Sequence, residues 1–184
     1  MKKGIGICLS LVSFAYTIWY MRFGIPYKNS GALSKIGLEH KGLFILWGVM
    51  TMTALSYNII IAYKRYLKTK AHIPLLAVCA VGMLLTLCFD FKYGVTPDYY
   101  LHCAGSLVFS AVMGITIFLL FLFCYDKSII FKLFTHISGL ILLSDLVCLL
   151  IIKETGLIEA LPIFAGYVML GIINTRRDRI EAVR

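Results

Sequence analysis

Charged residues are scarce in this sequence. They make up 15% of its 184 residues, whereas 60% are hydrophobic and the mean hydropathy is +0.89. A soluble domain of this size is about half apolar and about a quarter charged. A larger core cannot absorb the excess, because so short a chain still needs a polar surface. The composition therefore excludes a soluble globular domain and predicts an integral membrane protein.

Several patterns that would indicate chemistry are also missing. No CxxC pair occurs, and all six cysteines lie in or beside apolar runs, so we interpret them as packing residues rather than a redox relay. Neither HxxxH nor HExxH spacing is present, so no metal site is predicted. No low-complexity linker divides the chain, which indicates a single domain spanning residues 1–184.

What the sequence does contain is a series of long apolar runs. They cover approximately residues 4–21, 43–63, 73–91, 101–125, 129–152 and 157–173. A helix needs about 20 residues to cross the hydrocarbon core of a bilayer. The runs therefore predict an all-α polytopic membrane protein, a six-transmembrane-helix bundle. We expect the first run to be a retained helix rather than a signal peptide, because no small-x-small cleavage site follows it.

The basic residues are distributed unevenly on this topology. If the N-terminus is inside, twelve lie on the inner side: Lys2, Lys3, Lys64, Arg65, Lys68, Lys70, Lys127, Lys132, Arg176, Arg177, Arg179 and Arg184. Six lie on the outer side: Arg22, Lys28, Lys35, Lys41, Lys92 and Lys153. The positive-inside rule then predicts an N-in, C-in, multi-pass protein of the cell membrane. Topology and anionic lipid account for the net charge of +9, so we expect membrane lipids as partners and no nucleic acid.

Ionisable residues at membrane depth gather towards the outer side. This predicted outer polar cluster consists of Asp90, His102, Asp145, Glu159 and His40. Such groups are costly inside a bilayer, so each needs a partner or a task. We expect Asp145 to pair with His102 or with a polar group such as Asn58. Three interpretations stay open: a network that ties helix ends together, a site for a lipid headgroup or small amphiphile, and a metal-assisted hydrolase.

A row of small residues marks the run at 101–125. Ser106, Ser110 and Gly114 are four apart and therefore share one helix face. Small residues let helix backbones approach closely. The row predicts packing within the chain, with contact to another copy or to a partner membrane protein as the alternative.

The four histidines permit a different hypothesis. His40 and His102 open the second and fourth runs on the outer side, and His72 and His136 lie near inner ends. The stretch FDFKYGVTPDYYLHCAG and this placement resemble the dihaem cytochromes b of the ascorbate-reducible type. That resemblance implies a transmembrane electron carrier with two haem b groups. Otherwise no cofactor is expected.

A second resemblance covers residues 30–180. The stretches LSKIGLEHKGLF, LHCAGSLVFSAVMG and TGLIEALPIFAGYVMLGIINTRRD resemble the Frag/DRAM-type family of six-helix membrane proteins. The positions that match its patches are Ser34, Gly37, His102, Gly105 and Glu159. Lys35 and Ile36 stand where the family more often has an acidic residue. Bacterial relatives have unknown functions, and eukaryotic members are linked to remodelling of GPI lipid anchors and to autophagy.

These observations together favour a small membrane protein whose outer polar cluster binds or handles a lipid headgroup or small amphiphile. The dihaem electron carrier is the first alternative. A substrate-binding subunit of a membrane transporter is the second. The residues do not decide whether the protein is an enzyme.

Overall fold

The computed structural model describes residues 2–91, 94–151 and 155–176, and the elements found there are helices and turns. The α-helices are α1 (Lys2–Met21), α2 (Leu33–Glu39), α3 (Lys41–Ala62), α4 (His72–Cys88), α5 (Pro97–Phe123), α6 (Ile129–Ile151) and α7 (Gly156–Thr175). A π-helical turn over Tyr63–Leu67 extends α3, and 3-10 turns lie at Asn29–Gly31 and Tyr125–Lys127. The predicted all-α fold is confirmed.

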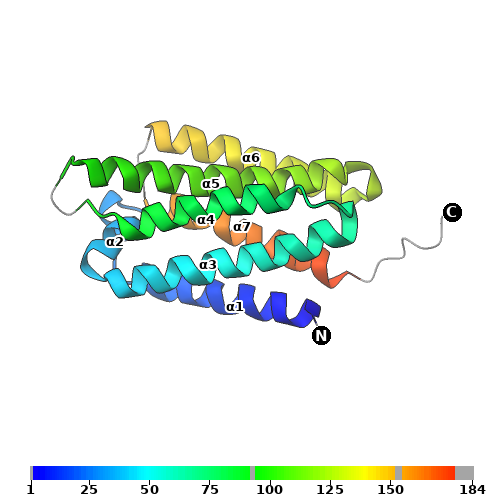
Figure 1. The fold of residues 1–184 in the computed structure, drawn as a ribbon, viewed down its shortest axis with the longest axis horizontal. Helices are drawn as coiled ribbons and strands as arrows, with labels where there is room; N and C mark the ends of the chain where they lie inside the picture. Colours follow the sequence, from blue (N-terminus) through cyan, green and yellow to red (C-terminus); the bar gives the residue numbers. More distant parts are fainter. Residues whose placement is uncertain (1, 92–93, 152–154, 177–184) are drawn as a thin grey trace.

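The six longer helices run side by side along the long axis of the molecule, and α2 lies at one end of the bundle (Figure 1). The N-terminus and the end of α7 lie at the opposite end (Figure 1). Five of these helices are long and apolar enough to span a membrane. The sixth, α4, has 17 residues and is about 26 Å long at 1.5 Å per residue.

Two predicted helix boundaries differ from the structure. The run at 73–91 ends as a helix at Cys88, and the next helix begins at Pro97 rather than near residue 101. Thr96 explains the earlier start, because its hydroxyl accepts a hydrogen bond from the Tyr99 amide (3.4 Å), a standard N-cap interaction. Proline in the first helical turn fits the same start, since its missing N–H has no intrahelical partner there.

The outer faces of the helices are as apolar as the core. Leu84 of α4, Leu143 of α6 and Leu161 of α7 are all more than half exposed. A helix that is apolar all round is buried in protein or lipid. These exposed side chains therefore support a multi-pass membrane location.

The closest helix contact joins α4 and α5 through two glycines. A Cβ atom placed on Gly105 would lie 2.7 Å from the carbonyl oxygen of Gly82 and 2.8 Å from the amide nitrogen of Thr86. Both neighbours are backbone atoms, so no side-chain movement could make room. Glycine at these positions holds α4 and α5 at backbone contact.

A buried amide pair ties three helices together near the termini. Asn58 of α3 donates to the Gly6 carbonyl (3.0 Å) and the Ser10 hydroxyl (3.1 Å) of α1. Its side-chain oxygen accepts a hydrogen bond from Asn174 of α7 (3.0 Å). The expected pairing of Asn58 with Asp145 is therefore wrong, because α1 and α7 already occupy the Asn58 side chain.

Candidate functional site

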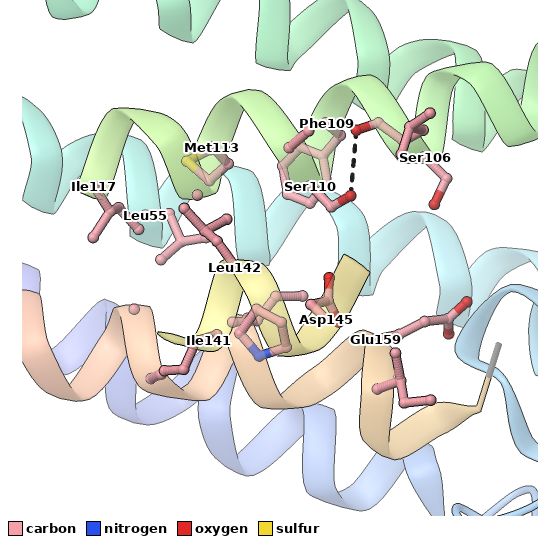
Figure 2. Close-up of a pocket in the computed structure, with 18 of the residues that line it drawn as sticks. Leu55, Ser106, Phe109, Ser110, Met113, Ile117, Ile141, Leu142, Asp145 and Glu159 are labelled. Atoms are coloured by element: carbon pink, nitrogen blue, oxygen red, sulfur yellow. Dashed lines mark hydrogen bonds between the residues drawn. The ribbon is translucent and has the colours of Figure 1, made fainter. Parts of the chain in front are cut away.

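A cavity of about 360 Å³ lies within the bundle. Side chains from α2, α3, α4, α5, α6 and α7 line it. Figure 2 labels lining residues from α3, α5, α6 and α7. Its volume falls in the range of small-molecule binding sites in proteins, roughly 300–1,000 Å³. This cavity is the candidate site.

The lining of the cavity is divided by polarity. Ser106 and Ser110 of α5, Asp145 of α6 and Glu159 of α7 gather on one side of the view in Figure 2. The other side is mainly apolar and includes Leu55, Met113, Ile117, Ile141 and Leu142, while the ring of Phe109 lies among the polar residues. The polar half is the one beside α2, since Ser34 of α2 both lines the cavity and bonds to Glu159. The site is therefore amphipathic along its length.

The small residues of α5 help to form this space. Ser106, Ser110 and Gly114 lie on one face and all line the cavity. A Cβ atom on Gly114 would lie 2.5 Å from a methyl carbon of Leu142, so α6 meets α5 at that level. Ser110 and Ser106 lie one and two turns nearer to α2 than Gly114, and these small side chains leave room that larger ones would fill. From the sequence, this row of small residues predicted close helix packing. That prediction missed Ser106 and Ser110 as residues of the site.

Asp145 is a carboxylate in an apolar helix, and none of the described residues is its partner. It lies half-buried in α6, about 9 Å along the helix from Ile151 at 1.5 Å per residue. Within the described part of the chain no hydrogen bond or ion pair reaches it, so the expected pairing with His102 is not found. An aspartate at the centre of a transmembrane helix costs about 2.5–3.5 kcal/mol, and less towards the ends. An interaction with a ligand would therefore stabilise the Asp145 carboxylate.

Glu159 has a different role in the structure, because it holds α2 in place. Its carboxylate accepts hydrogen bonds from the Leu33 amide and from the Ser34 hydroxyl (3.2 Å). Negative charge at a helix N-terminus is favourable, since the first amides there lack intrahelical partners. Leu33 and Ser34 themselves line the cavity, so α2 covers its polar end.

A backbone contact reinforces this cover. The Leu157 amide donates to the Pro26 carbonyl (3.0 Å), which joins the start of α7 to the segment before α2. A Cβ atom on Gly156 would lie 2.4 Å from the Gly31 carbonyl oxygen. Only glycine fits so close to that backbone. The segment from Pro26 to α2 is therefore packed directly on the start of α7.

The predicted outer polar cluster is divided in the structure. Asp145 and Glu159 line the cavity, and the other three members lie outside its lining. His102 approaches the Phe89 carbonyl with Nδ1 (3.0 Å) and packs on the ring of Phe91. The His40 ring packs on Phe23, 4.7 Å between centroids, and Asp90 is exposed beyond the end of α4.

The two inner histidines also have separate surroundings. The His72 ring is buried and packs on Tyr63, 4.9 Å between centroids. His136 is exposed on α6, with Nε2 3.2 Å from the Tyr125 hydroxyl. Among the described residues, no three His, Cys, Asp or Glu side chains gather as they would around a metal ion. The haem hypothesis stays a prediction, and a spectrum tests it.

Comparison with known proteins does not assign a function to this cavity. No family model, no curated protein and no solved structure matches the chain. The resemblance to the Frag/DRAM-type family and the resemblance to the dihaem cytochromes therefore stay predictions.

Proposed function

We propose that this chain is a six-span membrane protein that binds a membrane lipid or small amphiphile in the cavity. The headgroup occupies the polar half beside α2, and the first part of the apolar chain lies against α5, α6 and α7. The observation that carries the proposal is the division of the cavity into a polar half and an apolar half.

The cavity also reaches the surface of the bundle. Leu107 and Ile115 of α5 and Leu146 of α6 line it and are 56%, 44% and 53% exposed. A complete diacyl lipid is larger than the cavity, so its tails need a way out. The flank formed by α5 and α6 provides one directly into the bilayer.

Sidedness follows from the distribution of basic residues. Among the described residues, nine basic residues lie in segments at the end of the bundle where α1 begins and α7 ends, and four lie in segments at the α2 end. The positive-inside rule makes that end cytoplasmic. The polar half of the cavity, at the α2 end, then faces the outer leaflet.

The proposal is tested by filling the cavity. Ser110 and Ser144 are matched serines: each hydroxyl donates to the carbonyl three residues earlier, but Ser110 lines the cavity whereas Ser144 is exposed on α6. Thermal unfolding of purified protein is measured with a panel of lipids. A ligand at 100 times its Kd stabilises the folded state by about 2.7 kcal/mol, which raises Tm by roughly 5–10 °C for a chain of this size.

We expect at least one lipid to raise the Tm of the wild type and of Ser144→Leu, and to leave Ser110→Leu unchanged. The leucine at position 110 blocks the cavity, and the leucine at position 144 only meets lipid. Equal responses of the two variants would show that the lipid binds elsewhere.

A further inference from the structure

The charges of the cavity indicate what kind of headgroup it takes, an inference that rests on the proposed function. Asp145 and Glu159 are the only charged side chains among the described residues that line the cavity. No lysine, arginine or histidine in that lining could balance them or hold a bare phosphate. A cavity lined by charge of one sign favours ligands of the opposite sign.

The two carboxylates are not equivalent. Glu159 already accepts hydrogen bonds from the Leu33 amide and the Ser34 hydroxyl of α2. Asp145 accepts none from the described residues, although it is half-buried beside the cavity. Asp145 is therefore the acceptor that a ligand would satisfy, and Glu159 supports the site by holding α2.

The neighbouring hydroxyls narrow the chemistry further. The Ser110 hydroxyl donates its proton to the Leu107 carbonyl (3.3 Å), which leaves its oxygen free to accept. Ser106 lines the same half of the cavity one turn away. A primary ammonium group donates three hydrogen bonds, which one carboxylate and two hydroxyl oxygens can accept. A trimethylated ammonium donates none and would leave these acceptors unsatisfied.

We propose that the site is selective for amphiphiles with a protonated primary amine, bound through Asp145 with Ser106 and Ser110. Ion pairing between the ammonium and Asp145 removes the cost of an unpaired carboxylate at membrane depth. This chemistry occurs in aminophospholipids such as phosphatidylethanolamine and in simple long-chain alkylamines. Aminophospholipids and alkylamines are both included in the test.

The test compares ligands on the wild-type chain first. Tm is measured in detergent with phosphatidylethanolamine, phosphatidylcholine and phosphatidylglycerol of identical acyl chains, and with dodecylamine and dodecanol. We expect phosphatidylethanolamine to raise Tm by about 5 °C or more at saturation, and its two analogues to raise Tm by much less. If dodecylamine acts and dodecanol does not, the amine alone is sufficient. If phosphatidylethanolamine acts and dodecylamine does not, the amine must be presented on a phospholipid.

Variants then test whether Asp145 is responsible for the selectivity for amines. Asp145→Asn keeps the size of the side chain but loses its charge, and should weaken binding of the amine by about tenfold or more. Asp126→Asn is the control, because Asp126 is an exposed loop carboxylate outside the cavity. The comparison of matched lipids on the wild-type chain tests the selectivity for amines without any variant.

Each other outcome contradicts a stated part of the account. If phosphatidylglycerol or phosphatidylcholine stabilises as well as phosphatidylethanolamine, and Ser110→Leu abolishes the effect, the amphiphile site stands and the amine selectivity is wrong. If phosphatidylethanolamine stabilises Asp145→Asn as it does the wild type, Asp145 is not its partner. If no amphiphile raises Tm, the proposed function fails together with the inference.

Discussion

Replacing Glu159 by alanine should release α2 from the end of the bundle. The substitution removes the acceptor of the Leu33 amide and of the Ser34 hydroxyl. Hydrogen bonds to a charged group contribute about 1.5–3 kcal/mol each, and the half-buried position of Glu159 reduces this to about 1–2 kcal/mol for each of the two bonds. We therefore expect the opening of α2 to become easier by about 2–4 kcal/mol.

Hydrogen exchange measures this directly. Since about 1.4 kcal/mol is a factor of ten, peptides covering residues 33–39 should exchange roughly 30- to several hundred-fold faster in Glu159→Ala. Glu39→Ala is the control, because Glu39 is an exposed carboxylate at the other end of the same helix. Ser34→Ala, which removes one of the two bonds, should lie between them. Exchange in Glu159→Ala as slow as in Glu39→Ala would refute the role assigned to Glu159.

Three further predictions test other parts of the account. Gly105→Ala should destabilise the protein by about 1–3 kcal/mol because the new methyl group meets the backbone of α4, whereas Gly171→Ala, with open space around it, should be neutral or stabilising in thermal unfolding. A cysteine at position 30 in a cysteine-free background should react with an impermeant reagent added to sealed cells and a cysteine at position 68 should not; labelling at 68 would reverse the orientation. The visible spectrum of purified protein should show no Soret band, and a two-haem spectrum lost in His102→Ala or His136→Ala would favour the electron carrier.

The long helices were predictable because their signal is local. Each apolar run is bounded by charged or turn residues, and no distant contact is needed to recognise it. The short helix α2 was not predicted from the sequence. Its seven residues carry no N-capping side chain of their own, and the acceptor that meets its first amide is Glu159, 126 positions away. Such a long-range contact leaves no mark on the local pattern.

The position of the polar residues along the helices was also predictable, but the direction in which each side chain points around the bundle was not. Counting along the runs placed Asp145 and His102 in the outer half. Which neighbours each side chain meets depends on how the helices are rotated and crossed. That packing turns His102 to the Phe89 carbonyl at the end of α4, while Asp145 lines the cavity. Counting along the sequence identified Asp145 as a carboxylate within an apolar helix, but it could not identify the surroundings of that side chain.

Photolabelling of the cavity tests the central claim most directly. A photoreactive alkyl amphiphile is incorporated with the purified chain, activated in the presence or absence of excess unlabelled lipid, and the modified peptides are mapped by mass spectrometry. We predict labelling at cavity positions such as Met113 and Leu142 that excess lipid suppresses and Ser110→Leu abolishes, while Ser144→Leu retains it. Labelling confined to lipid-facing residues such as Leu84 and Leu143, unaffected by competitor and equal in both variants, would contradict an amphiphile site inside this bundle.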